Sequence, residues 1–72
     1  MPRQFNDVMD TDETIKKMVN EEGCVPTMDY CFERGMKKLF KVKLNNDYKS
    51  AQDAAWYFNK WAEIYQEHQK HI

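Results

Sequence analysis

Four side chains of this 72-residue sequence are of the types that bind zinc: Cys24, Cys31, His68 and His71. Six residues separate the two cysteines and two separate the histidines, which matches no common zinc-finger spacing. We therefore expect no metal and no cofactor. Two cysteines are also too few to staple a secreted mini-protein, so we predict reduced thiols and a cytoplasmic location.

The nucleophiles and general bases that an enzyme needs are sparse in this sequence. Ser50 is the only serine, and we expect it to cap a helix. Carboxylates are numerous, but nothing in their arrangement marks a pair for acid–base chemistry. The two glycines, Gly23 and Gly35, are too few for a phosphate-binding Gly-rich loop. We predict no catalytic residue and a protein that is not an enzyme.

The formal net charge of -1 conceals an uneven distribution of charge along the chain. Residues 1–35 carry eight acidic and four basic side chains, whereas residues 36–50 carry five lysines and one acid. A basic segment of this kind can dock on an acidic protein surface or contact nucleic-acid phosphates. The residues that we expect to do so are Lys37, Lys41, Lys43 and Lys49. Because the sequence pI is only about 6.1, nucleic-acid binding is the less favoured of the two roles.

Length and hydropathy indicate one small domain. A chain of this mass buries about 60% of its unfolded surface on folding, which is enough for a single core. The longest unbroken apolar run covers residues 54–58, far short of the roughly 18 residues that span a membrane. We therefore predict a single domain over residues 1–72, without a membrane span, in which residues 1–9 form a flexible arm.

Apolar residues spaced at 3.6 residues per turn predict two helices. One covers residues 11–22, with Asp10 as its N-cap and Gly23 as its C-terminal stop. The other covers residues 51–68 and follows Ser50. We expect one face of this second helix to lie on the core. The residues of that face are Ala51, Ala54, Ala55, Phe58, Ala62 and Tyr65.

Residues 28–44 fit two patterns. With a period of two, apolar and polar residues alternate on both sides of Gly35, which would supply the left-handed position of a hairpin turn. With a period of 3.6 they form an equally good helical stripe, in which Gly35 costs about 1 kcal/mol. The alternation in residues 40–44 favours the hairpin. We predict an α+β fold, helix–β-hairpin–helix, with an all-α three-helix bundle as the alternative.

The aromatic residues of the last predicted helix are the strongest indication of a function. Trp56 points away from the expected core face, and Trp and Tyr are enriched among interface hot spots. We therefore predict a partner-binding face there, with an N-terminal arm that folds over Trp56 through Phe5 and Val8 as the alternative. The residues of the predicted face are Trp56, Tyr57, Lys60, Trp61 and Ile64.

Together these features predict a small non-catalytic protein that binds a larger protein stoichiometrically, as an inhibitor or adaptor. A homodimer that buries Trp56 is a second possible assembly, and nucleic-acid binding through residues 37–49 is the alternative function. In its short length and its content of Lys, Asn and Met, the chain resembles the accessory proteins that phages direct against host enzymes. That resemblance, which involves no motif, implies a modulator of a host enzyme.

Overall fold

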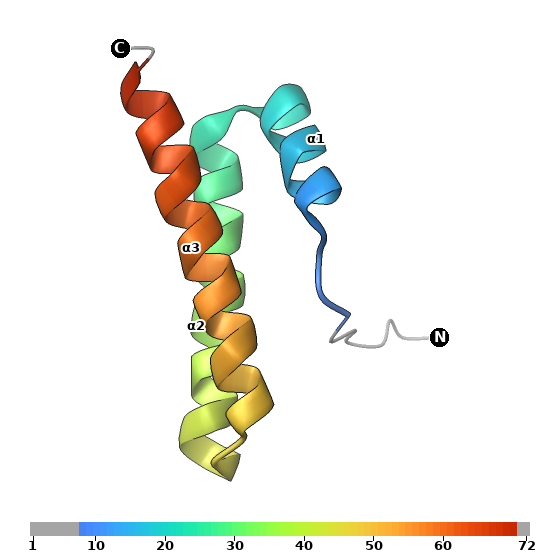
Figure 1. Ribbon diagram of the computed structural model, residues 1–72, viewed down its shortest axis with the longest axis vertical. Helices are drawn as coiled ribbons and strands as arrows, with labels where there is room; N and C mark the ends of the chain where they lie inside the picture. Colours follow the sequence, from blue (N-terminus) through green and yellow to red (C-terminus); the bar gives the residue numbers. More distant parts are fainter. Residues whose placement is uncertain (1–7, 71–72) are drawn as a thin grey trace.

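Three helices contain most of the residues that the computed structural model describes, which are residues 8–70. Helix α1 spans Asp12–Glu22, α2 spans Cys24–Asn45 and α3 spans Tyr48–Lys70 (Figure 1). No strand occurs within this range, so the predicted α+β fold with a hairpin in residues 28–44 is wrong. The fold is the all-α alternative. None of these three helices is long and apolar enough to cross a membrane.

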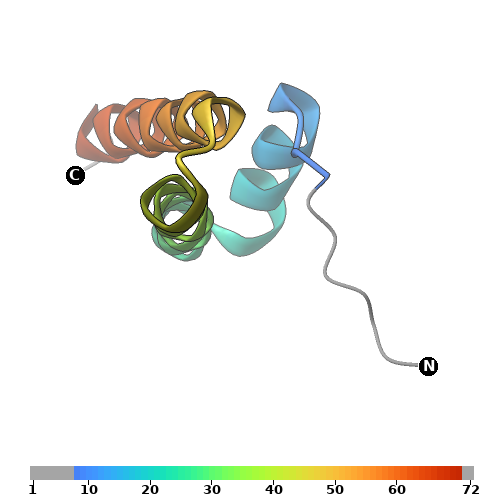
Figure 2. The ribbon, with the colours of Figure 1, turned by 90° about the horizontal axis from the view of Figure 1, so that it is seen from below.

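Helices α2 and α3 lie antiparallel and side by side along their length, and they form the long axis of the molecule (Figure 1). Helix α1 lies beside one half of this helical hairpin. Seen along the hairpin in Figure 2, α1 flanks one side of the α2–α3 pair and leaves the opposite side uncovered. We call these two sides the α1 side and the open side.

Gly35 explains why the middle of the chain is helical and not a hairpin. It is buried within α2, and a Cβ atom at this position would lie 2.7 Å from Cε1 and 2.8 Å from Cζ of Phe58. Its φ is not positive, so the glycine provides no left-handed turn. Its role is to let α3 approach α2 closely. Packing of two long helices outweighs the roughly 1 kcal/mol that glycine costs inside a helix.

The link between α1 and α2 consists of a single residue. Gly23 has φ 99° and ψ 170°, and its N–H donates to the carbonyl of Val19 at 2.9 Å. The observed first helix therefore ends where the sequence places its stop. At its other end the N–H of Thr14 donates to Oγ1 of Thr11 at 3.2 Å, so Thr11 is the N-cap in place of Asp10.

The turn between α2 and α3 consists of Asn46 and Asp47. Asn46 is left-handed, with φ 56° and ψ 42°, and its N–H donates to the carbonyl of Val42 at 2.7 Å. The Asp47 carboxylate accepts from the N–H of Lys49 at 3.2 Å and from the hydroxyl of Ser50 at 2.9 Å. Asp47 thus caps α3, and Ser50 lies within the first turn of the helix.

The core lies between α1 and the hairpin. Its buried apolar side chains are Ile15, Cys31, Tyr57 and Ile64, one or two from each helix. The predicted core face of α3 is wrong for Ala55, Ala62 and Tyr65, which are exposed. The reason is that α3 has apolar residues on two sides, and α1 covers the side that carries Tyr57 and Ile64.

Candidate interaction surface

The predicted partner-binding residues lie mainly on the α1 side, where the chain uses them itself. The side chains of Tyr57 and Ile64 are 0% and 7% exposed, so neither offers a contact surface to a partner. The Trp56 ring packs edge-on against Tyr57, with 5.0 Å between ring centroids. Lys60 Nζ lies 5.3 Å from the centroid of Trp56 and forms an ion pair with Asp12 at the start of α1.

Trp61, the remaining predicted residue, borders the open side. Its ring stacks on that of Tyr65, with 5.5 Å between centroids and 3° between planes. It is partly buried and also packs against the core. Of the five residues predicted to bind a partner, only Trp61 therefore adjoins the uncovered side of the hairpin.

A polar cluster holds the N-terminal segment against the hairpin. The hydroxyls of Tyr57 and Tyr30 donate to Oδ2 of Asp10 at 2.6 and 2.8 Å. Nε of Arg34 lies 3.2 Å from the Tyr57 hydroxyl, and its Nη2 donates to the carbonyl of Val8 at 3.0 Å. Burial and the hydrogen bond to Asp10 raise the pKa of Tyr30 to about 12. Burial also raises the pKa of Tyr57, so both tyrosines are neutral hydrogen-bond donors. The cluster therefore has a structural role, which is to hold the segment before α1 against α2 and α3.

The two cysteines lie in different environments. Cys31 is buried in the core, and desolvation raises the pKa of its thiol to about 11, so the reactive thiolate is disfavoured. Cys24 is partly exposed and lines a cleft of about 300 Å³ between α1 and α3. Among residues 8–70, no three Cys, His, Asp or Glu side chains are grouped to hold a metal. His71 lies outside the described residues.

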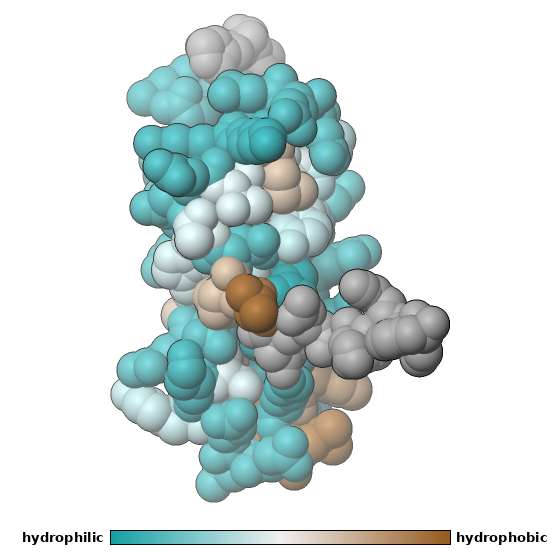
Figure 3. Space-filling view, turned by 90° about the vertical axis from the view of Figure 1, so that its right-hand side faces the viewer, coloured by the Kyte–Doolittle hydropathy of each residue, from teal (hydrophilic) through white to brown (hydrophobic). Residues whose placement is uncertain are grey.

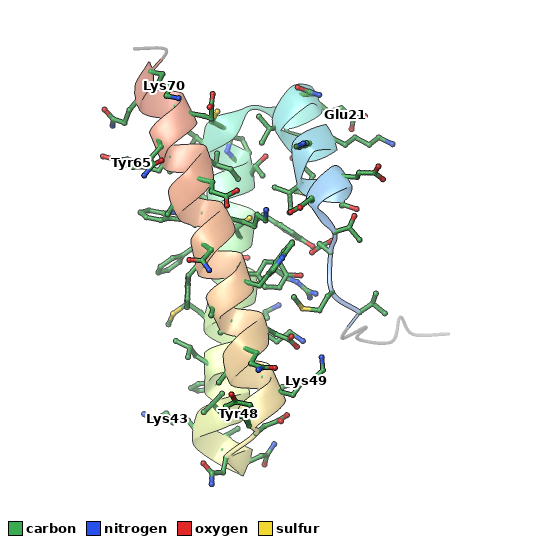
Figure 4. All side chains as sticks on the ribbon, in the orientation of Figure 1. Glu21, Lys43, Tyr48, Lys49, Tyr65 and Lys70 are labelled. Atoms are coloured by element: carbon green, nitrogen blue, oxygen red, sulfur yellow. The ribbon has the colours of Figure 1, made fainter. Side chains whose placement is uncertain are left out.

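The predicted basic residues do not line up in a single row on one face, because they lie on two helices. Lys37 and Lys41 are one turn apart, whereas Lys43 is about 200° further round α2 than Lys41. Lys49 belongs to α3, where its Nζ lies 3.7 Å from Oδ1 of Asp53. Figure 4 shows Lys43 and Lys49 on opposite sides of the turn end. The lysines surround this end of the hairpin without forming a single phosphate-binding face.

The open side carries the main exposed apolar surface. Phe32, Met36 and Phe40 recur every four residues along α2 and are 48%, 47% and 63% exposed. The ring of Phe58, from α3, lies 5.9 Å from that of Phe32 and joins the two helices across this side. Tyr65 points away from α1 in Figure 4. We call this surface the open face. Its apolar residues are Val25, Phe32, Met36, Leu39, Phe40, Phe58, Ala62 and Tyr65.

The two sides of the molecule differ in character. The side that carries α1 is mostly hydrophilic (Figure 3). The sequence did not predict the open face, because Phe32, Met36 and Phe40 belong to the helical stripe that was only the alternative for the middle segment, and the partner-binding face was expected around Trp56. The sequence assigned that stripe, like the alanine-rich face of α3, to the core. Cys31 and Ala54 are buried as expected, whereas Phe32, Met36, Phe40, Ala62 and Tyr65 remain exposed within residues 8–70.

Comparison of the chain with protein-family models, with curated proteins and with solved structures found no match.

Proposed function

We propose that the protein acts without catalysis, by docking its open face on an apolar helical surface of another protein chain. The observation that carries this proposal is the row of Phe32, Met36 and Phe40, three large apolar side chains that are each about half exposed. Contiguous exposed apolar surface of this kind is typical of interaction sites. A row at i, i+4 and i+8 is also the pattern by which one helix packs on another.

The apolar row supplies only part of the free energy that association requires. Full burial of a Phe or Met side chain contributes about 1.5–3 kcal/mol, so covering the exposed halves of three contributes about 2–4 kcal/mol. Association itself costs several kcal/mol of translational and rotational entropy. The rest of the open face and the charges at its ends must therefore add to the binding. This supports a stoichiometric binder, as expected for an inhibitor or adaptor.

Nucleic-acid binding has no comparable support, because the lysines are distributed around the turn end. The free thiols of Cys24 and Cys31 fit a reducing compartment such as the cytoplasm, which we include in the proposal.

The test compares two exposed apolar residues on opposite sides of the molecule. Phe40→Glu places a charge on the open face. Val8→Glu places the same charge outside that face, at a residue beside α1 that is 70% exposed. Both variants should fold as the wild type does, by circular dichroism. Immobilised wild type and Val8→Glu should retain the same protein from a nuclease-treated lysate, or a second copy of the chain, and Phe40→Glu should lose it. Equal retention by all three proteins would contradict the proposal.

A further inference from the structure

We propose that the partner on the open face is a second copy of this chain, packed antiparallel so that α2 crosses α2 of the copy at Met36. This inference rests on the proposed function, because it names the occupant of the same face. It is carried by a symmetric pattern of apolar and charged residues along the exposed side of α2.

The pattern is centred on Met36. Phe32 and Phe40 lie four residues before and after it, and all three are about half exposed. Asp29 and Lys43 lie seven residues before and after it, and both are exposed. Seven residues make nearly two full turns, so both charges lie on the same side of α2 as Met36, about 10 Å from it along the axis.

A two-fold rotation about an axis through Met36, perpendicular to α2, superimposes this pattern on its complement. Phe32 of each chain then meets Phe40 of the copy, and Asp29 of each chain lies beside Lys43 of the copy. Two ion pairs result, one at each end of an apolar centre. A parallel dimer would place Asp29 beside Asp29 and Lys43 beside Lys43. The charges therefore select the antiparallel arrangement.

The state of these two charges in the single chain agrees with this assignment. Within residues 8–70, neither Asp29 nor Lys43 takes part in an ion pair or a side-chain hydrogen bond. Lys60, on the α1 side, is paired with both Asp12 and Glu63. The two charges that flank the open face thus remain available for a partner in this part of the chain.

Helix α3 and the overall charge distribution favour the same partner. The exposed Ala62 of the open face is a small residue, which allows a helix of the copy to come close to α3. Residues 36–50, at the turn end, carry five lysines and one acid, whereas residues 8–35 carry seven acids and three bases. Figure 4 shows Glu21 near the opposite end from Lys43. Antiparallel packing places the basic end of each chain towards the acidic part of the other.

The test exchanges the two charges and uses the full chain, with analytical ultracentrifugation over a wide range of concentration at low ionic strength. Wild type should form a dimer. Asp29→Lys alone and Lys43→Asp alone each convert both ion pairs into like-charge contacts, so each should raise the dimer dissociation constant about tenfold or more. An equimolar mixture of these two variants should form a heterodimer with wild-type affinity, because every contact is again between opposite charges.

The variant that carries both exchanges in one chain should also regain the wild-type dissociation constant, which shows that the single variants fold correctly. Val8→Glu should dimerise as the wild type does. Added salt should weaken the wild-type dimer and strengthen association of the single variants.

Three results would overturn the inference: a wild-type monomer at all concentrations, a dimer insensitive to both single exchanges, or single variants that the mixture fails to rescue. A monomer that still retains another protein through Phe40 would leave the proposed function intact and remove only the second copy. If Phe40→Glu changed the retention of neither a second copy nor another protein, the proposed function itself would be contradicted.

Discussion

Both sides of the α2–α3 hairpin carry large apolar side chains, and these side chains have different fates. On the α1 side, Ile64 and Tyr57 are buried, and the Tyr57 hydroxyl is hydrogen-bonded to Asp10 and Arg34. On the open side, Phe32 and Phe40 remain about half exposed. Within residues 8–70, one short helix is available to cover two apolar sides. The comparison teaches that α1 completes the hairpin on one side only, and the exposed apolar residues of the other side are the basis of the proposal that another chain covers it.

The largest effect that this comparison predicts is at Tyr57. Tyr57→Ala removes a fully buried side chain and leaves a cavity, so we expect the free energy of unfolding to fall by about 3–5 kcal/mol. A core of this size rarely supplies more than that in total. Urea denaturation followed by circular dichroism should therefore find little folded protein.

Phe40→Ala is the matched change on the open side. At a concentration where the chain is monomeric, it should lower the free energy of unfolding by less than about 1 kcal/mol, because the side chain is already 63% exposed. If Tyr57→Ala and Phe40→Ala lowered the free energy of unfolding equally, the distinction between a side covered by α1 and an uncovered side would not hold.

The amphipathic periods of the helices could be predicted from the sequence, and the side on which α1 packs could not. On α3, Tyr57 and Ile64 have helical spacing, and so do Ala55, Ala62 and Tyr65. Either set fits a core. The choice depends on contacts between distant parts of the chain, such as the hydrogen bond of Asp10 to Tyr57, 47 residues away. Local periodicity contains no information about such a contact.

The middle of the chain shows a second limit of local reasoning. Gly35 fits a turn when only its neighbours in sequence are considered, because glycine is the usual residue at left-handed positions. In the fold it faces Phe58, which is 23 positions further along the chain. The packing of α3 on Gly35 therefore determines that this segment is helical.

The next largest effect should follow loss of the polar anchor. Asp10→Ala leaves the hydroxyls of Tyr30 and Tyr57 without their acceptor, so we expect a loss of about 1–3 kcal/mol. Amide exchange should increase in α1 more than in the distal half of the hairpin. Glu13→Ala, which removes an exposed carboxylate that has no ion pair or side-chain hydrogen bond within residues 8–70, should change exchange in α1 much less. Similar protection factors in both variants would show that the cluster does not hold α1.

Alkaline pH should lower the stability of the α1 side without any mutation. The pKa of Cys31 is raised to about 11 and that of Tyr30 to about 12, in both cases first by burial. A raised pKa favours the protonated folded form, so both contributions are complete below pH 9 and are lost as the pH rises towards 12. Denaturation midpoints should fall steadily over this range. In Tyr30→Phe the fall above pH 10 should be shallower, and an identical curve would contradict this assignment.

A small effect is expected at Gly35, where two opposing contributions partly cancel. Gly35→Ala gains about 1 kcal/mol of helix propensity and costs about 1–3 kcal/mol by forcing its Cβ against the Phe58 ring. We expect a net loss of about 1 kcal/mol. In a Phe58→Ala background the steric cost disappears, so the same substitution should stabilise the chain. A double-mutant cycle by urea denaturation measures this reversal of sign. Its absence would mean that Phe58 does not determine how closely α2 approaches α3, and hence how the open face is shaped.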